Sequence, residues 1–167
     1  MRFRVTFAVL ALATSLSWAG PSWAQSTPQA SAAPPQVSTS FTPDDVAAIL
    51  RDAGYRAQIE FKDNTYSIVT GMGGYTVVAW LICDKNKSCD SLDWDIAFNA
   101  SPSFTLELAN KWNREKRYAK AYIATNGRFF IEYSMEFTGG VTRAAVAQSA
   151  RRFDSLCSEF ETWSKSD

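Results

Sequence analysis

The chain has 167 residues, of which 46% are hydrophobic and 14% aromatic, and it carries 17 lysines and arginines, 17 aspartates and glutamates and no histidine. This length suits one folded domain, and the balanced charge gives no electrostatic attraction to nucleic acid, so we expect no nucleic-acid partner. The lack of histidine excludes a serine triad of the usual kind and most zinc sites, and we expect no catalytic residue, no metal and no cofactor.

The N-terminal segment has the features of a secretory signal. Residues 1–24 start with the basic "MRFR", continue as an apolar run and end in "PSWA", where Ser22 and Ala24 are the small residues typical of a cleavage site. An uncleaved membrane anchor is the alternative, but the apolar run is too short and too rich in serine to span a bilayer comfortably. We therefore expect a signal peptide cleaved after Ala24, a periplasmic or secreted protein, and no membrane insertion after cleavage.

The next segment is unlike a folded chain. Residues 25–40, "QSTPQASAAPPQVSTS", contain no charged residue and three of the six prolines. Such a segment buries too little apolar surface to offset the loss of chain entropy, so we expect a disordered leader. The folded domain is then predicted at residues 41–163.

The first part of this domain has the pattern of one helix followed by four strands. Thr42 suits an N-cap, Pro43 the first helical position and Gly54 the end of the helix. The four strands are predicted at residues 55–61, 65–71, 75–83 and 92–99. The third is almost entirely apolar, so we expect it in the middle of the sheet. The "GMGG" at 71–74 lacks the spacing and the following helix of a phosphate-binding loop, and it predicts a tight hairpin turn.

A second helix, a hairpin and a third helix complete the domain. Residues 101–117 predict a helix capped by Ser101 or Ser103. The Asn-Gly pair at 126–127 is a strong hairpin signal, and a last helix is predicted after its cap Thr142. The two hairpin strands are predicted at residues 119–125 and 128–137. The order α-β-β-β-β-α-β-β-α, with strands joined by short turns, predicts an α+β fold in which helices pack on one side of an antiparallel sheet.

The three cysteines divide into a pair and a single thiol. Cys83 and Cys89 flank the turn-like "DKNKS" at the ends of two predicted strands, so an exported chain is expected to join them in a disulfide across the hairpin mouth. A metal or redox pair is the alternative, which the spacing and the absence of histidine disfavour. Cys157 lies on the apolar stripe of the last helix, which predicts a buried thiol that serves packing.

Cations and aromatic residues supply the candidates for a binding surface. Arg114, Arg117, Lys120 and Arg128 predict an anion-binding patch for an acidic partner segment. The simpler alternative, which the pattern favours, is that they decorate a helix end and an edge strand. The aromatic content is high for such a domain, and alternation leaves open which way Trp80, Trp94 and Phe130 face. The candidate partner-binding residues are therefore Arg114, Arg117, Lys120, Arg128, Trp80 and Trp94.

Two pairs of carboxylates are the remaining candidates for chemistry. Asp93 and Asp95 share one face of a predicted strand, and so do Glu132 and Glu136. An acid and base pair needs a cleft that holds the two carboxyl groups in different environments, and the sequence shows no such cleft. A solvated sheet face is the favoured interpretation.

The helix–hairpin junction resembles that of a known family. The residues that carry the resemblance are Asn110, Trp112, Asn113, Arg117, Tyr118, Gly139, Gly140 and Val141. On these residues the chain is similar to the YbjN family, described as bacterial sensory-transduction regulators, over nearly all of residues 41–163. The resemblance implies a fold akin to that of type III secretion chaperones, which bind other proteins, and it implies no catalytic reaction, cofactor or active-site residue.

These observations together predict an exported, non-enzymatic module of the YbjN type that binds a protein or peptide, with a regulatory or chaperone-like role. The partner is not identified by the sequence, and a homodimer is one of the arrangements left open. The alternative is a carrier of a small ligand or lipid, with aromatic residues lining a cavity between sheet and helices.

Overall fold

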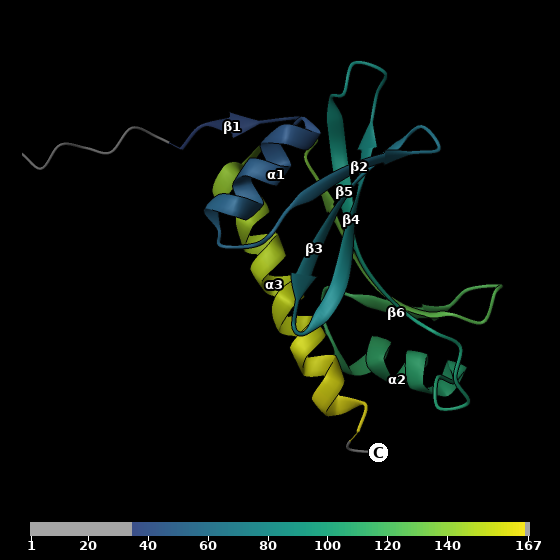
Figure 1. Cartoon of the computed structure of the whole chain (residues 1–167). Helices are drawn as coiled ribbons and strands as arrows, with labels where there is room; N and C mark the ends of the chain where they lie inside the picture. The colour runs from purple at the N-terminus through teal and green to yellow at the C-terminus, as the bar shows by residue number, and fades with distance from the viewer. Residues whose placement is uncertain (1–34, 166–167) are drawn as a thin grey trace, which may run out of the picture. The chain divides into compact units, whose positions relative to one another are not determined.

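The computed structural model describes residues 35–165 (Figure 1). The predicted signal peptide and the predicted leader up to residue 34 lie outside the described residues. Within the described part, three helices lie against one face of a six-stranded antiparallel sheet, which is the predicted α+β arrangement. The elements are β1 (Val37–Ser38), α1 (Pro43–Asp52), β2 (Gln58–Lys62), β3 (Thr65–Met72), β4 (Tyr75–Cys83), β5 (Cys89–Phe98), α2 (Leu106–Glu115), β6 (Lys120–Ile123), β7 (Phe129–Glu136), β8 (Val141–Thr142) and α3 (Arg143–Trp163).

The strand order of the sheet is β2-β3-β4-β5-β7-β6, and every neighbouring pair is antiparallel. β4 has a neighbour on each side, as its apolar sequence predicts. Directly opposite residues share a face of a sheet, so the register defines two neighbouring rungs that face opposite ways. The inner rung, toward the helices, is Ile59, Ile68, Ala79, Trp94 and Tyr133. The outer rung is Gln58, Val69, Val78, Asp95, Glu132 and Lys120.

Aromatic side chains fill the space between the sheet and the helices. Trp94 stacks on Phe153 of α3 with ring centroids 6.3 Å apart, and its indole Nε1 donates to Ser149 Oγ at 3.1 Å. Further along α3, Phe160 contacts rings from β5, β7, α2 and the turn before α2, namely Phe98, Phe129, Trp112 and Phe104. Burial of each such ring contributes on the order of 2–3 kcal/mol. This cluster fixes α2 and α3 against the same face of the sheet.

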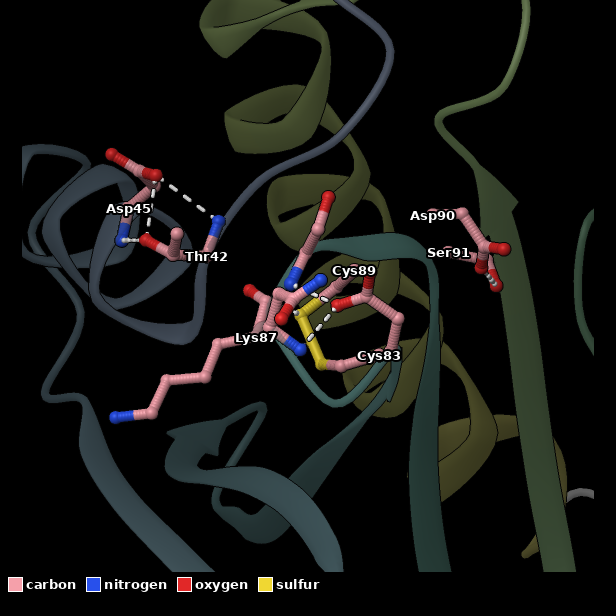
Figure 2. The surroundings of a disulfide bond; sticks show 10 residues. Thr42, Asp45, Cys83, Lys87, Cys89, Asp90 and Ser91 are labelled. Carbon is pink, nitrogen blue, oxygen red and sulfur yellow. Dashed lines mark hydrogen bonds between the residues drawn. A yellow bond between two sulfur atoms is a disulfide. The ribbon is translucent and has the colours of Figure 1, made fainter.

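The caps of α1 and α3 are those that the sequence predicts. At the start of α1, the Asp45 N–H donates to Thr42 Oγ1 at 3.1 Å, and the Thr42 N–H donates to Asp45 Oδ2 at 3.0 Å (Figure 2). These two hydrogen bonds form a capping box, which satisfies helix N–H groups that have no partner within the helix. Thr142 caps α3 by accepting from the Ala145 N–H at 3.1 Å.

The predicted cap of α2 is wrong. Thr105, and neither Ser101 nor Ser103, accepts from the Leu108 N–H, at 3.1 Å. The two serines instead hold a turn of their own, in which the Phe104 N–H donates to the Ser101 carbonyl at 3.0 Å. Serine side chains bond to nearby backbone equally well in turns and in caps, so composition alone does not separate the two uses.

A short pair of strands extends the fold before the predicted domain boundary. Val37 and Ser38 of β1 pair with Thr142 and Val141 of β8. The prediction of a disordered leader is therefore wrong for residues 37–38, although no alternation of apolar residues marks them. Their order comes from hydrogen bonds to a segment about a hundred residues away in sequence, which local composition does not report.

The predicted disulfide joins Cys83 and Cys89 at the turn end of the β4–β5 hairpin, where residues 84–88 connect the two strands (Figure 2). Cys89 is fully buried, and its backbone exchanges two hydrogen bonds with Phe41, at 2.9 and 3.0 Å. The hairpin end is thereby attached to the residue directly before the cap of α1. Cys157 is a free, buried cysteine, as its position on the helix stripe predicts.

No helix in residues 35–165 combines the length and the apolar character needed to cross a membrane.

Candidate functional site

The sheet face that points away from the helices, here called the outer face, is the candidate site. Side chains alternate between the two faces of a strand, so the residues that neighbour the buried inner rung point outward. Two large apolar side chains of β4 remain exposed there, Trp80 at 42% and Ile82 at 44%. Other residues on this face of the central and neighbouring strands include Val78, Asp93, Asp95, Phe130, Glu132, Lys120 and Tyr122. Exposed aromatic and aliphatic groups of this kind are typical of binding surfaces.

The middle of the outer face is hollowed into a depression of about 240 Å³, here called the Asp95 recess. Its lining residues are Thr76, Val78, Trp80, Asp95, Ala97, Arg128 and Phe130. Asp95 Oδ2 accepts a hydrogen bond from the Trp80 indole Nε1 at 3.3 Å. Asp95 Oδ1 is buried and has no hydrogen-bond partner among the described residues. Burial raises the pKa of this carboxyl from 3.8 to about 6, against the smaller lowering effect of the Trp80 hydrogen bond.

Next to the recess, Glu132 holds the cation of the edge strand. Lys120 Nζ lies 2.6 Å from Glu132 Oε1, and the Tyr122 hydroxyl donates to Glu132 Oε2 at 3.0 Å. The hydrogen bond to Glu132 raises the pKa of Lys120, and burial followed by the Glu132 carboxylate raises that of the Tyr122 hydroxyl. The charge of Lys120 is thus compensated within the protein.

The predicted basic patch is not assembled as one cluster. Lys120 pairs with Glu132, and the Arg128 guanidinium lies over the Phe130 ring, 5.3 Å from its centroid. Arg114 belongs to α2, which packs on the helix side of the sheet, and Arg117 follows the end of that helix. Both are exposed. Of the four predicted cations, only Lys120 and Arg128 therefore lie on the outer face.

The two candidate tryptophans point in opposite directions. Trp80 is on the outer face, whereas Trp94 is 0% exposed and packs against α3. The structure therefore excludes Trp94 from an accessible binding surface. A usable signal was present, because Trp94 alternates with Asp93 and Asp95 and shares its face with the apolar Leu92.

Asp95 is the outer-face residue that the sequence did not single out for binding. Because Asp95 shares a strand face with Asp93, the sequence predicts that both carboxylates are solvated. In the structure, Oδ1 of Asp95 is buried. Asp95 Oδ2 accepts a hydrogen bond from the indole of Trp80 on the neighbouring strand β4. That contact depends on strand register, which the sequence of β5 alone does not specify.

Two other regions bear on the predicted chemistry. Burial raises the pKa of the Cys157 thiol to about 12, so that the reactive thiolate is absent near neutral pH. An open cavity of about 580 Å³ lies between the ends of the β2–β3 and β4–β5 hairpins; among its lining residues are Phe61, Tyr66, Lys85 and Lys87. Among residues 35–165 there is no group of three or more acidic residues and cysteines arranged to hold a metal ion.

Comparison with known proteins identifies a family. Neither a curated protein nor a solved structure matches the chain. The predicted likeness to type III secretion chaperones therefore stays a prediction. A family model described as "Putative bacterial sensory transduction regulator" matches residues 42–165, which span α1 to the end of α3 and include the helix–hairpin junction. The chain therefore belongs to the YbjN family.

Proposed function

We propose that this protein is an exported, non-enzymatic binding module that docks a polypeptide partner on the outer face of its sheet. The observation that carries the proposal is the one-sided arrangement of the fold. All three helices of the described part cover one face, and the other face presents Trp80 and Ile82 to solvent. Buried aromatic anchors contribute most of the binding energy in typical protein interfaces.

Export is supported by two independent features. The sequence of residues 1–24 has the three parts of a secretory signal. The Cys83–Cys89 disulfide suits an oxidising compartment such as the periplasm. A regulatory role agrees with the description of the family. Under this proposal the module acts by recognising a partner in the cell envelope or outside the cell.

The alternative of a small-ligand carrier has one observation in its favour. The cavity between the hairpin ends, at about 580 Å³, falls within the range of small-molecule sites and has Phe61 and Tyr66 in its lining. The space between sheet and helices, where this alternative places the small ligand or lipid, is occupied by the packed rings around Phe160. A ligand retained in a native mass spectrum of the purified protein would support the carrier.

The test of the proposed function is site-specific photocrosslinking in cells that produce the protein. A photoreactive phenylalanine analogue replaces Ile82 on the outer face or, as the control, the exposed Gln148 on α3. We expect a discrete crosslinked polypeptide from position 82 and none of the same mass from position 148. Crosslinks of equal yield from both positions, or none from position 82, would contradict docking on the outer face. A product of twice the chain mass would identify the partner as a second copy.

A further inference from the structure

The Asp95 recess contains a charged group that is left incompletely satisfied by the fold. Asp95 Oδ2 has the Trp80 indole as its donor, but Oδ1 is buried without any partner in the described residues. A buried acceptor without a donor carries a desolvation cost, which folded proteins normally avoid by pairing it. Such a group in a hollow of an exposed face is typical of a position that a partner completes.

The charges around Asp95 favour a cation in this position. Glu132 lies directly opposite Asp95, Asp93 lies two residues away on the same strand face, and both carboxylates make the electrostatic potential at Asp95 more negative. Of the two nearby cations, Lys120 is paired with Glu132, and Arg128 is stacked on the Phe130 ring. Both leave Oδ1 of Asp95 without a donor. The Phe130 ring is already contacted by Arg128 and stacked on Tyr122, whereas the exposed Trp80 ring contributes an aromatic wall, and aromatic rings attract cations through the ring quadrupole.

We infer that the Asp95 recess receives one lysine or arginine side chain of the polypeptide partner, whose cation pairs with the Asp95 carboxylate beside the Trp80 indole. The inference rests on the proposed function, because it names the side chain by which the docked polypeptide is recognised. The volume of about 240 Å³ suits a single long side chain. Val78 gives the recess an apolar wall, and the exposed Ile82 extends the contact beyond the recess, a surface that a free amine would leave unused.

The first experiment measures whether the recess binds a guanidinium. The probe is N-acetyl-argininamide, its uncharged counterpart is N-acetyl-citrullinamide, and the readout is the Trp80 indole N–H signal in a ¹H–¹⁵N NMR spectrum at pH 7.5. We expect a saturable shift of this signal with the arginine probe, and at least a tenfold weaker response with citrulline and in Asp95→Asn. Equal responses to both probes, or an unchanged arginine response in Asp95→Asn, would overturn the inference.

The second experiment asks whether a polypeptide uses the same recess. Crosslinking from position 82 is repeated in Asp95→Asn and in Asp93→Asn, which removes the same charge from the same strand face. We expect the yield to fall at least fivefold in Asp95→Asn and less than twofold in Asp93→Asn. Equal losses in the two variants would show a general charge effect and overturn the inference. An unchanged yield in Asp95→Asn would overturn it as well, while leaving docking on the outer face in place.

Arg128→Ala is the control that tests whether Asp95 pairs with a cation of this protein itself. If Arg128 turned from Phe130 to pair with Asp95 in solution, its removal would open the recess and strengthen probe binding. With the recess open to its partner, Arg128→Ala is expected to change the affinity for the arginine probe by less than threefold. A larger gain in Arg128→Ala would show that Asp95 is already occupied by this protein's own guanidinium, and would overturn the inference.

Discussion

Gly73 shows how a single residue in a hairpin turn sets the distance between sheet and helix. Its φ of +55° lies in the left-handed region, and its N–H donates to Asp154 Oδ1 of α3 at 2.6 Å. A Cβ built on this glycine would lie 2.7 Å from both the Cβ of Cys157 and the backbone nitrogen of Ser158. The "GMGG" segment is thus a hairpin turn, as predicted, and in addition the point at which the β3–β4 turn touches α3.

Gly73→Ala is expected to lower the free energy of unfolding by about 2–4 kcal/mol, because backbone strain adds to a clash with the helix. Gly74→Ala is the matched control. Gly74 also has a positive φ, of +83°, but nothing lies within 4 Å of its built Cβ. The control should cost only about 1 kcal/mol. Urea unfolding followed by circular dichroism measures both, and equal losses would contradict the proposed contact with α3.

Asp95 makes stability depend on pH in an unusual direction. The folded state raises the pKa of its carboxyl from 3.8 to about 6, so the folded state holds a proton that the unfolded state has released. Stability is therefore expected to fall as pH rises through this interval and to stay lower above it. The charged groups facing Asp95 are Asp93, Glu132, Lys120 and Arg128.

Asp95→Asn removes this titration. Its unfolding free energy should exceed that of the unmodified protein by an amount that grows between about pH 4 and pH 7, to on the order of 1–2 kcal/mol after allowance for solvent screening. Urea unfolding at several pH values measures the difference, with Asp93→Asn as the charge-matched control. A variant less stable than the unmodified protein at pH 7 would show that Asp95 is paired in solution.

Among the elements, the edge strand β6 is protected by α2. The Ala121 N–H donates to Asn113 Oδ1 at 2.7 Å, and Asn113 Nδ2 donates to the Ala121 carbonyl at 3.0 Å. The side chain thereby imitates a neighbouring strand and satisfies the backbone of a sheet edge, where unpaired groups invite association. Trp112 adds a third contact, since its Nε1 donates to the Ala119 carbonyl at 3.1 Å.

Asn113→Ala is expected to cost about 1–3 kcal/mol, because both backbone groups of Ala121 lose their partner. Hydrogen exchange of the Ala121 amide should accelerate accordingly, since opening of the edge becomes easier. Asn110→Ala is the control, since Asn110 is exposed on the same helix and its replacement should change stability by less than about 0.5 kcal/mol. If the Ala121 amide exchanged at its original rate in Asn113→Ala, the two hydrogen bonds from Asn113 would not be what protects the sheet edge.

Across the whole domain, the turn end of the β4–β5 hairpin, which carries the disulfide, is joined to the start of α1 by backbone hydrogen bonds. Cys89 is bonded covalently to Cys83 and through two backbone hydrogen bonds to Phe41. The Phe41 ring in turn packs edge-on against Phe137, with centroids 5.0 Å apart. The buried Phe41 therefore joins the β4–β5 hairpin, the start of α1 and the residue that follows β7.

Replacing both cysteines of the pair by serine is expected to lower the free energy of unfolding by about 2 kcal/mol, the loop-closure entropy of so short a ring. Urea unfolding with and without a thiol reductant measures the effect. The reductant should weaken the unmodified protein by a similar amount and leave the double variant unchanged. A double variant that still responds to the reductant would show that the stabilisation comes from elsewhere.

The sequence by itself determined the order of helices and strands, the caps Thr42 and Thr142, and the Cys83–Cys89 bond. Each of these depends on apolar periodicity or on contacts between residues at most six positions apart, so the local pattern contains the information. Only the tertiary structure decided the rest. The β1–β8 pair, the hydrogen bonds of Asn113 to β6 and the hydrogen bond of Trp80 to Asp95 each require a partner 8 or more residues away. Strand register and helix packing bring such partners together, and for that reason the buried oxygen of Asp95 becomes visible only in the folded chain.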